Sequence, residues 1–301
     1  MLKNYLTKKI VYVLPLIFLI TPIIFNFYIT SPALDEGYNN AGDDAIHLAY
    51  EHELKSIILE EKKLFGWSYL YGAGEPIFIY RPPLFYFAVV LSHFLSFELL
   101  SLAFLHKAVI VLFYSLYPLS VYYMTSKFGF SKITCGLAAL LSPLAISAHG
   151  NTIQAYFNFG VHKQLIAIFL FPIAIGKLHG VIKNNENFAS LPFITALMYL
   201  SHPFISYMFV IITGLYFLTL FFHERLKYFL IKSKKIIIIM TIGFMQLCFY
   251  LVPFISSDEV KRADMYSSGF RATSFDVVMF TKEEAIKNLF SGSLLDRGKN
   301  L

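Results

Sequence analysis

Two adjacent acids and a histidine, Asp43, Asp44 and His47, are the residues of this chain whose types and spacing could do chemistry. Asp43, His47 and Glu51 follow one another at intervals of four, so in a helix they lie on one face. Carboxylates in the first turn of a helix face the positive end of its dipole, which favours their ionised form. An ionised carboxylate can accept a proton from a hydroxyl group, or bind Mg²⁺ or Mn²⁺ through its oxygens. The same acids could instead only cap the helix, and His47 could simply pair with Asp43 or Glu51.

These residues open a polar segment, residues 43–86, that lies between strongly apolar runs. Apolar residues recur mostly every third or fourth position from Ile46 onward, which predicts an amphipathic helix. Its apolar stripe consists of Ile46, Tyr50, Leu54, Ile57, Ile58, Leu64 and Phe65. We expect this stripe to lie on a membrane surface. We expect a solvated face at Glu51, Glu53, Glu60, Glu61, Lys62 and Lys63. Gly72, Gly74 and Pro76 would end the helix.

The composition is that of an integral membrane protein. Hydrophobic residues make up 57% of the 301 residues, charged residues make up 15%, and the mean hydropathy is +0.61. A soluble domain carries about 25% charged residues. The net charge of +6 comes from bases in short loops between apolar runs, which indicates membrane topology and not nucleic-acid binding. Cys135 and Cys248 both lie inside apolar runs, so neither a disulfide framework nor a cysteine metal site is predicted.

Seven membrane-spanning helices fit the apolar runs of the sequence. Lys3, Lys8 and Lys9 precede the first run, residues 10–30, which is long enough for a retained spanning helix with a cytoplasmic N-terminus. A signal peptide cleaved near Ser31 is the alternative. The other six runs are residues 103–124, 133–148, 164–182, 190–201, 203–222 and 236–255.

The apolar segment 82–98 decides between two topologies. If it does not cross the membrane, all the basic loops share the cytoplasm with the N-terminus, as the positive-inside rule requires. If it crosses and residues 190–222 form one kinked helix, two of the basic loops move outside. The charge distribution favours the first topology. Residues 31–103 are then the first extracytoplasmic loop of a membrane domain, 1–255, and residues 256–301 are an external loop or the start of a missing C-terminal region.

The first external loop combines several short motifs in a fixed order. They are GDDAIH at 42–47, Trp67, GAGEP at 72–76 and YRPPLFY at 80–86. With these motifs the loop resembles the first loop of the GT-C superfamily of membrane glycosyltransferases. Within it, the loop is most similar to the prokaryotic group labelled a "6-pyruvoyl-tetrahydropterin synthase-related" membrane domain. Further similarities to that group are Leu141-Ser142-Pro143, Phe159-Gly160 and Ser201-His202-Pro203. Pterin chemistry is not predicted, because no histidine triad for zinc can be read from the sequence.

The resemblance implies a GT-C-like core that transfers a sugar from a polyprenyl-phosphate donor to an acceptor at the outer membrane face. In such enzymes an acid of the first external loop is the base or helps to hold a divalent cation. This assigns Asp43, and after it Asp44, as catalytic residue and ligand of Mg²⁺ or Mn²⁺, with His47 beside them. Phosphate oxygens of the donor would need cationic partners. The external candidates are Arg81, Lys107, His162, Lys163, Lys261 and Arg262; Trp67 and His202 complete the predicted substrate-binding residues.

The substrate-binding candidates also have plain structural interpretations. Trp67 and Arg81 could anchor in the headgroup region, His162 and Lys163 flank a span, and His202 could make a structural hydrogen bond. Two other functions stay open for the chain. A transporter or flippase of a lipid-linked saccharide would carry paired ionisable residues at mid-membrane depth. A non-catalytic membrane module of a larger assembly would need no such site.

Overall fold

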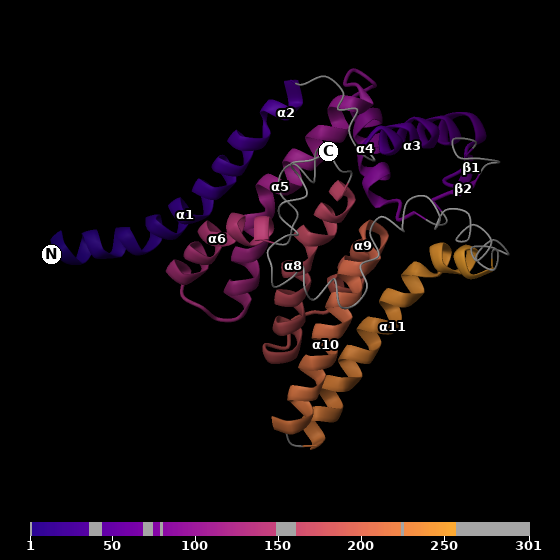
Figure 1. Cartoon of the computed structure of the whole chain (residues 1–301). Helices are drawn as coiled ribbons and strands as arrows, with labels where there is room; N and C mark the ends of the chain where they lie inside the picture. Colours follow the sequence, from indigo (N-terminus) through magenta and orange to yellow (C-terminus); the bar gives the residue numbers. More distant parts are fainter. Residues whose placement is uncertain are drawn as a thin grey trace, which may run out of the picture. The chain divides into compact units, whose positions relative to one another are not determined.

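The computed structural model describes residues 2–35, 44–68, 75–78, 81–148, 161–223 and 226–256, which are mostly helical (Figure 1). The helices are α1 (Leu2–Thr30), α2 (Pro32–Asp35), α3 (Asp44–Ser56), α4 (Leu84–Leu95), α5 (Leu102–Lys127), α6 (Lys132–Ala148), α8 (Gln164–Lys183), α9 (Ser190–Ser201), α10 (Pro203–His223) and α11 (Leu226–Ser256). The shorter elements are a π-helical turn η1 (Ile57–Glu61), a 3-10 turn η2 (Val161–Lys163), and an antiparallel pair of strands, β1 (Gly66–Ser68) and β2 (Glu75–Ile77). The predicted all-helical class is confirmed apart from this pair. The chain divides into two compact units, Met1–Tyr250 and Leu251–Leu301, and all helices except the last residues of α11 belong to the first.

In the described part of the chain, five helices are long and apolar enough to cross a membrane. They cover Val13–Leu34, Leu102–Lys127, Gln164–Lys183, Pro203–His223 and Tyr228–Val252. Each has between 20 and 26 residues. At 1.5 Å per residue, about 20 residues cross a hydrocarbon core that is about 30 Å thick. The length and composition of these helices are consistent with the integral membrane protein that the sequence predicts.

Three further apolar helices are shorter than a full span. α6 has 17 residues, and α9 and α4 have 12 each. The structure therefore supports five of the seven predicted spans by length, and the crossing of α6 and α9 stays a prediction. α4 occupies the apolar segment 82–98, and its length agrees with the topology in which this segment does not cross.

α5 and α8 lie side by side and run in the same direction. At their starts, the ring centroids of His106 in α5 and of His162, just before α8, lie 4.5 Å apart. At their ends, Lys127 of α5 donates a hydrogen bond of 2.8 Å to Glu186, which follows α8. Since α6 lies between them in sequence, it provides the return from one end to the other.

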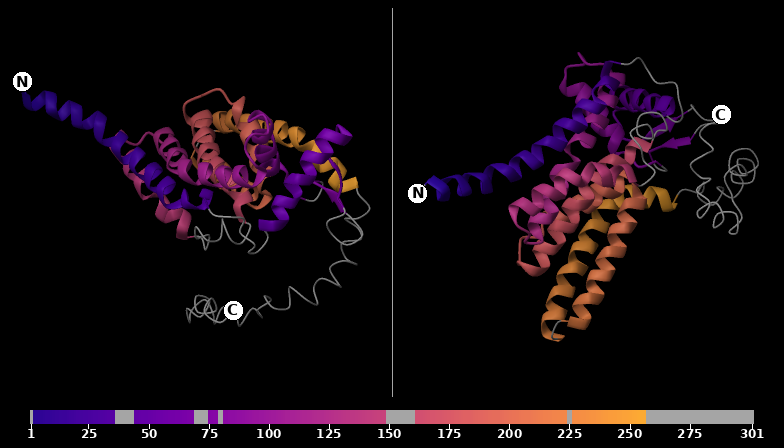
Figure 2. Two further views of the ribbon diagram at one scale, coloured as in Figure 1. Left: turned by 90° about the horizontal axis from the view of Figure 1, so that it is seen from above. Right: turned by 60° about the vertical axis from the view of Figure 1, so that its left-hand side comes forward.

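α9, α10 and α11 continue this alternation between two ends. Ser201, the last residue of α9, donates a 2.6 Å hydrogen bond to the carbonyl of Lys163 at the start of α8, so α9 runs antiparallel to α8. The hydroxyl of Tyr216 in α10 lies 3.2 Å from Nδ1 of His179 near the end of α8, so α10 runs parallel to α8. Figures 1 and 2 show α10 and α11 side by side as two long helices.

Lysines gather at one of these two ends. Lys127 and Lys177 both pair with Glu186, at 2.8 and 3.8 Å, and Lys235 of α11 donates to the Asn185 side chain at 2.9 Å. The hydrogen bond from Lys127 holds the pKa of the Glu186 carboxyl below its ordinary value, so this acid is ionised at neutral pH. These contacts join basic residues of α5, α8 and α11 to the connection between α8 and α9, and we call this end of the helices the lysine end.

The amphipathic helix of the first loop is shorter than predicted, and its stripe packs against protein. α3 ends at Ser56 and passes into η1, which Lys62 closes in a left-handed conformation with φ 56°. Tyr50 and Leu54 are fully buried in a core shared with α4 and α5, whereas Leu64 is exposed. The prediction that the apolar stripe lies on a membrane surface is therefore wrong for its buried members Tyr50, Leu54 and Ile57, because they pack in a core with α4 and α5.

Gly176 of α8 provides a test of the contact between α5 and α8. A Cβ at this position would lie 2.9 Å from the Cα of Met124 in α5, and backbone cannot yield as a side chain can. We expect Gly176→Ala to separate the helices and to lower the free energy of unfolding by about 1–3 kcal/mol. The measurement is denaturation in detergent followed by circular dichroism. Gly214→Ala in α10 is the matched control, because a Cβ there meets nothing within 4 Å. Equal stability of the two variants would contradict the close approach of α8 to α5 at Gly176.

Candidate functional site

α3 presents two ionisable side chains to the protein interior. His47 and Glu51, one turn apart, are 2% and 0% exposed, and they share their side of the helix with Tyr50 and Leu54. A charged side chain is buried only where partners compensate for the lost water. The predicted solvated face is therefore wrong for Glu51; it is confirmed for Glu60, Glu61, Lys62 and Lys63, which are exposed.

The carboxylate of Glu51 pairs with His106 of α5. Oε1 of Glu51 and Nδ1 of His106 lie 2.6 Å apart, and His106 is 1% exposed. Because a carboxylate accepts hydrogen bonds, the imidazole donates its Nδ1–H. Attraction between such groups is strong where water is excluded and the dielectric is low. The pair therefore fastens the first-loop helix α3 to the start of a membrane-spanning helix.

His47 pairs with Tyr86, in the first turn of α4. Nδ1 of His47 lies 2.7 Å from the Tyr86 hydroxyl, and both side chains are buried. This partner was not predicted from the sequence, which left open a role of His47 at the substrate or a pairing with Asp43 or Glu51. The contact joins the start of α3 to the start of α4.

His162 brings these two pairs into one group. Its ring centroid lies 4.8 Å from that of His47 and 4.5 Å from that of His106, with both rings edge-on to it. Phe85 of α4 packs against His162 at 4.5 Å and adds an apolar wall. Three histidines from α3, α5 and η2 therefore meet away from water. We call the group of His47, Glu51, Tyr86, His106 and His162 the histidine cluster.

Cationic side chains lie next to the histidine cluster. Nζ of Lys163 lies 5.9 Å from the centre of the Tyr86 ring. Cζ of Arg81 lies 4.7 Å from the centre of the Tyr50 ring, which itself packs against Tyr86. Both arrangements are of the cation–π kind. Lys107, which follows His106 of the cluster in α5, is 4% exposed.

The end of α9 lies beside the start of α8, next to Lys163. The Ser201 hydroxyl accepts a hydrogen bond from the backbone N–H of Ala167 and donates one to the carbonyl of Lys163. Burial lowers the pKa of the next residue, His202, and the nearby charge of Lys163 lowers it further. Both effects favour the neutral imidazole. The structure thus brings together four of the predicted substrate-binding residues: Arg81, His162, Lys163 and His202.

The remaining predicted residues lie wholly or partly outside the described part of the chain. Asp43, Lys261 and Arg262 lie outside it. The structure describes the backbone of Asp44, the first residue of α3, and of Trp67 in β1. It does not describe their side chains. Within the described ranges, no three His, Cys, Asp or Glu side chains are arranged to hold a metal ion. The roles of Asp43 and Asp44 as base or as ligands of Mg²⁺ or Mn²⁺ stay predictions.

Sequence reasoning missed two members of the histidine cluster, His106 and Tyr86. His106 lies inside an apolar run that was assigned to a spanning helix, and an ionisable residue in such a run is the signal that could have found it. Tyr86 was quoted only as the last residue of a motif, and its partner His47 is 39 residues away. No periodicity connects positions so far apart.

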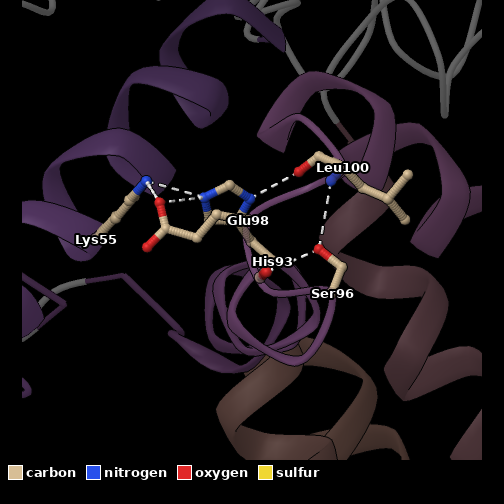
Figure 3. A network of polar contacts seen from close by, with 5 residues as sticks. All are labelled: Lys55, His93, Ser96, Glu98 and Leu100. Atoms are coloured by element: carbon tan, nitrogen blue, oxygen red, sulfur yellow. Dashed lines mark hydrogen bonds and ion pairs between the residues drawn. The ribbon is translucent and has the colours of Figure 1, made fainter.

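A second polar network fastens the other ends of α3 and α4 (Figure 3). Nζ of Lys55 donates a 2.6 Å hydrogen bond to Glu98 and lies 2.9 Å from Nε2 of His93. Nδ1–H of His93 donates to the Leu100 carbonyl at 2.7 Å, which leaves Nε2 to accept from Lys55. The hydrogen bond from Lys55 lowers the pKa of the Glu98 carboxyl. α3 and α4 are therefore joined at both ends and run parallel.

The buried pair of Glu51 and His106 can be tested by a double-mutant cycle. Each single substitution removes the 2.6 Å contact from a buried ionisable side chain, so Glu51→Gln and His106→Gln should each lower the free energy of unfolding by about 3–5 kcal/mol. The double variant should lose clearly less than the sum of the two. Unfolding in detergent measures the four stabilities.

Glu61→Gln is the control for this cycle, because Glu61 pairs with Lys63 at the surface and its loss should cost less than about 0.5 kcal/mol. Additive effects of the two single substitutions, or single effects as small as that of the control, would show that the pair does not hold the site together.

Comparison with protein-family models, with curated proteins and with solved structures found no match for this chain. The resemblance to GT-C glycosyltransferases therefore rests on the short motifs of the first loop, and the chemistry rests on the geometry of the site.

Proposed function

We propose that this chain is a membrane glycosyltransferase that transfers a sugar from a polyprenyl-phosphate-linked donor to an acceptor at the extracytoplasmic face. The observation that carries the proposal is the grouping of cationic and histidine side chains at one end of apolar helices. Arg81, Lys163 and the histidine cluster come from segments far apart in the sequence and lie close together. Ionisable residues in such surroundings are costly, and they mark functional sites by default.

The charges of this group suit a phosphate. Among the described residues, Arg81, Lys107 and Lys163 are cations, and the one acid of the histidine cluster, Glu51, is paired with His106. Arginine and lysine bind phosphate oxygens through charge-assisted hydrogen bonds, which are stronger than neutral ones. A negatively charged lipid phosphate could bind to these side chains in this way.

The depth of the site suits a lipid-linked donor. The apolar span of α5 begins at Leu102, and His106 and Lys107 follow four and five residues later. At 1.5 Å per residue these side chains lie about 6–8 Å below the start of the span. A phosphate at this level would keep its polyprenyl chain in the hydrocarbon and its sugar toward water.

The distribution of bases supports an extracytoplasmic site. The site lies where α5 and α8 begin, and the lysine end lies where both helices finish. Lysines and arginines favour the cytoplasmic side of membrane proteins. We therefore propose a cytoplasmic N-terminus and lysine end, with residues 31–103 on the other side.

In this proposal the acids of the first loop perform the chemistry. Asp44 begins α3 one turn before His47, which is part of the histidine cluster. Asp43 precedes it by one residue. Either carboxylate at the start of α3 could accept the proton of the acceptor hydroxyl, directly or beside a bound Mg²⁺ or Mn²⁺. The cations next to the cluster would hold the phosphate of the donor.

Transfer of labelled sugar from polyprenyl-phosphate donors tests the proposal. We expect Asp43→Asn to lower transfer by about 10²–10⁴-fold, the usual contribution of a general base, and Asp44→Asn to lower it less. Lys163→Gln should weaken use of the donor by about tenfold or more, because a hydrogen bond to a charged group is lost. Lys63→Gln is the control, since Lys63 is an exposed residue that pairs with Glu61.

The same assay separates the alternatives. Loss of transfer in EDTA and recovery with Mn²⁺ or Mg²⁺ would assign the acids to a metal site. Equal transfer by all variants would overturn the assignment of Asp43 and Asp44. Movement of the donor across the membrane without transfer of its sugar would favour a flippase.

A further inference from the structure

One exposed surface of the protein consists of large apolar side chains. It lies at the end of α4 and in the connection from α4 to α5. Its members are Leu91, Leu95, Phe97, Leu99 and Leu100, which are 58%, 71%, 86%, 84% and 42% exposed. We call this surface the apolar tip. Water is a poor solvent for such a group, so another apolar phase must cover it.

α4 carries large apolar side chains on its exposed side as well as on its buried side. Phe85, Val89 and Val90 are buried against the protein, and Leu91 and Leu95, four residues apart, lie on the opposite side. A helix with large apolar side chains on opposite sides needs apolar surroundings on both sides, as in a protein core or a membrane. The protein covers the buried side of α4, and the exposed side needs a further apolar cover.

The apolar tip lies directly before α5, which has an exposed apolar face of its own. Leu100 lies two residues before α5 begins at Leu102. Along α5, Phe104, Leu112 and Leu119 are exposed at intervals of seven or eight residues, so they form one face of this spanning helix. A connection of six residues, 96–101, cannot carry the tip far from the membrane at which α5 starts.

In the connection from α4 to α5 the charged side chain of Glu98 is paired, and the apolar side chains beside it are exposed. Phe97 and Glu98 both have left-handed backbones, with φ 53° and 61°. Within this turn the Glu98 carboxylate reaches back to Lys55 of α3, as Figure 3 shows. Phe97 and Leu99, on either side of it, are the two most exposed members of the tip. The pair with Lys55 neutralises the one acid that would oppose contact with lipid.

We propose that α4 and the apolar tip insert into one leaflet of the bilayer. The 12 residues of α4 are about 18 Å long, which is too short to cross the membrane and long enough to lie within one leaflet. Acyl chains cover Leu91, Leu95, Phe97 and Leu99, and the network of Lys55, His93 and Glu98 stays at the level of the headgroups. This contact is independent of the enzymatic activity proposed above.

Spin labels in lipid nanodiscs test the insertion. Phe97→Cys and Leu99→Cys are labelled separately in a background without Cys135 and Cys248, replaced by serine. Both positions are so exposed that labelling does not disturb the core. Collision of each label with oxygen, which concentrates in lipid, is compared with collision with a water-soluble nickel chelate. Three reference positions define the environments: Leu112 for lipid, Lys63 for water and Val111, 3% exposed, for protein interior.

The proposal predicts that both tip labels behave like the label at position 112, with frequent oxygen collisions and about tenfold fewer nickel collisions than at position 63. Nickel collisions as frequent as at position 63 would place the tip in water and overturn the proposal. Few collisions with either reagent, as at position 111, would mean that a second copy or another protein covers the tip, and would overturn it as well.

Discussion

The buried contact between Glu51 and His106 is the interaction on which the rest of the site depends. Both side chains are almost completely removed from water, at 0% and 1% exposure, and they meet at 2.6 Å. Neither could be buried alone without a large free-energy cost. Their attraction therefore fixes α3 on α5, and the contacts of His47 with Tyr86 and with His162 follow from that placement.

Two ends of the same helices have different chemistry. At the lysine end, Glu186 gathers basic side chains from neighbouring junctions, and these charges are solvated or partly exposed. At the other end, the histidine cluster lies in the interior, and α3 and α4 cover it. In lipid, helices make their backbone hydrogen bonds internally, and ionisable side chains that face lipid are costly. Functional side chains therefore gather at covered ends of the helices such as this one. The proposed transferase site and the proposed lipid contact of α4 both belong to this end.

The sequence predicts the helices of this protein better than its site. Long apolar runs have one stable form in a bilayer, so the five long spans could be read from hydropathy. The spacing of His47 and Glu51 correctly placed them on one face, but the same spacing fits a solvated face and a buried one. Their partners, His106 and Tyr86, lie 55 and 39 residues away, and only tertiary packing selects them. Lys163 and Arg81 were predicted from charge alone, and packing brings them beside the cluster.

Binding of the lipid phosphate tests the central claim most directly. A polyprenyl phosphate and the polyprenol of the same chain length would be titrated against the protein in nanodiscs. The charges beside the histidine cluster predict that the phosphate binds at least about tenfold more tightly, because each charge-assisted hydrogen bond contributes about 1.5–3 kcal/mol. Lys163→Gln should reduce this preference. Equal affinity for phosphate and alcohol would contradict the assignment of this site to a lipid-linked phosphate.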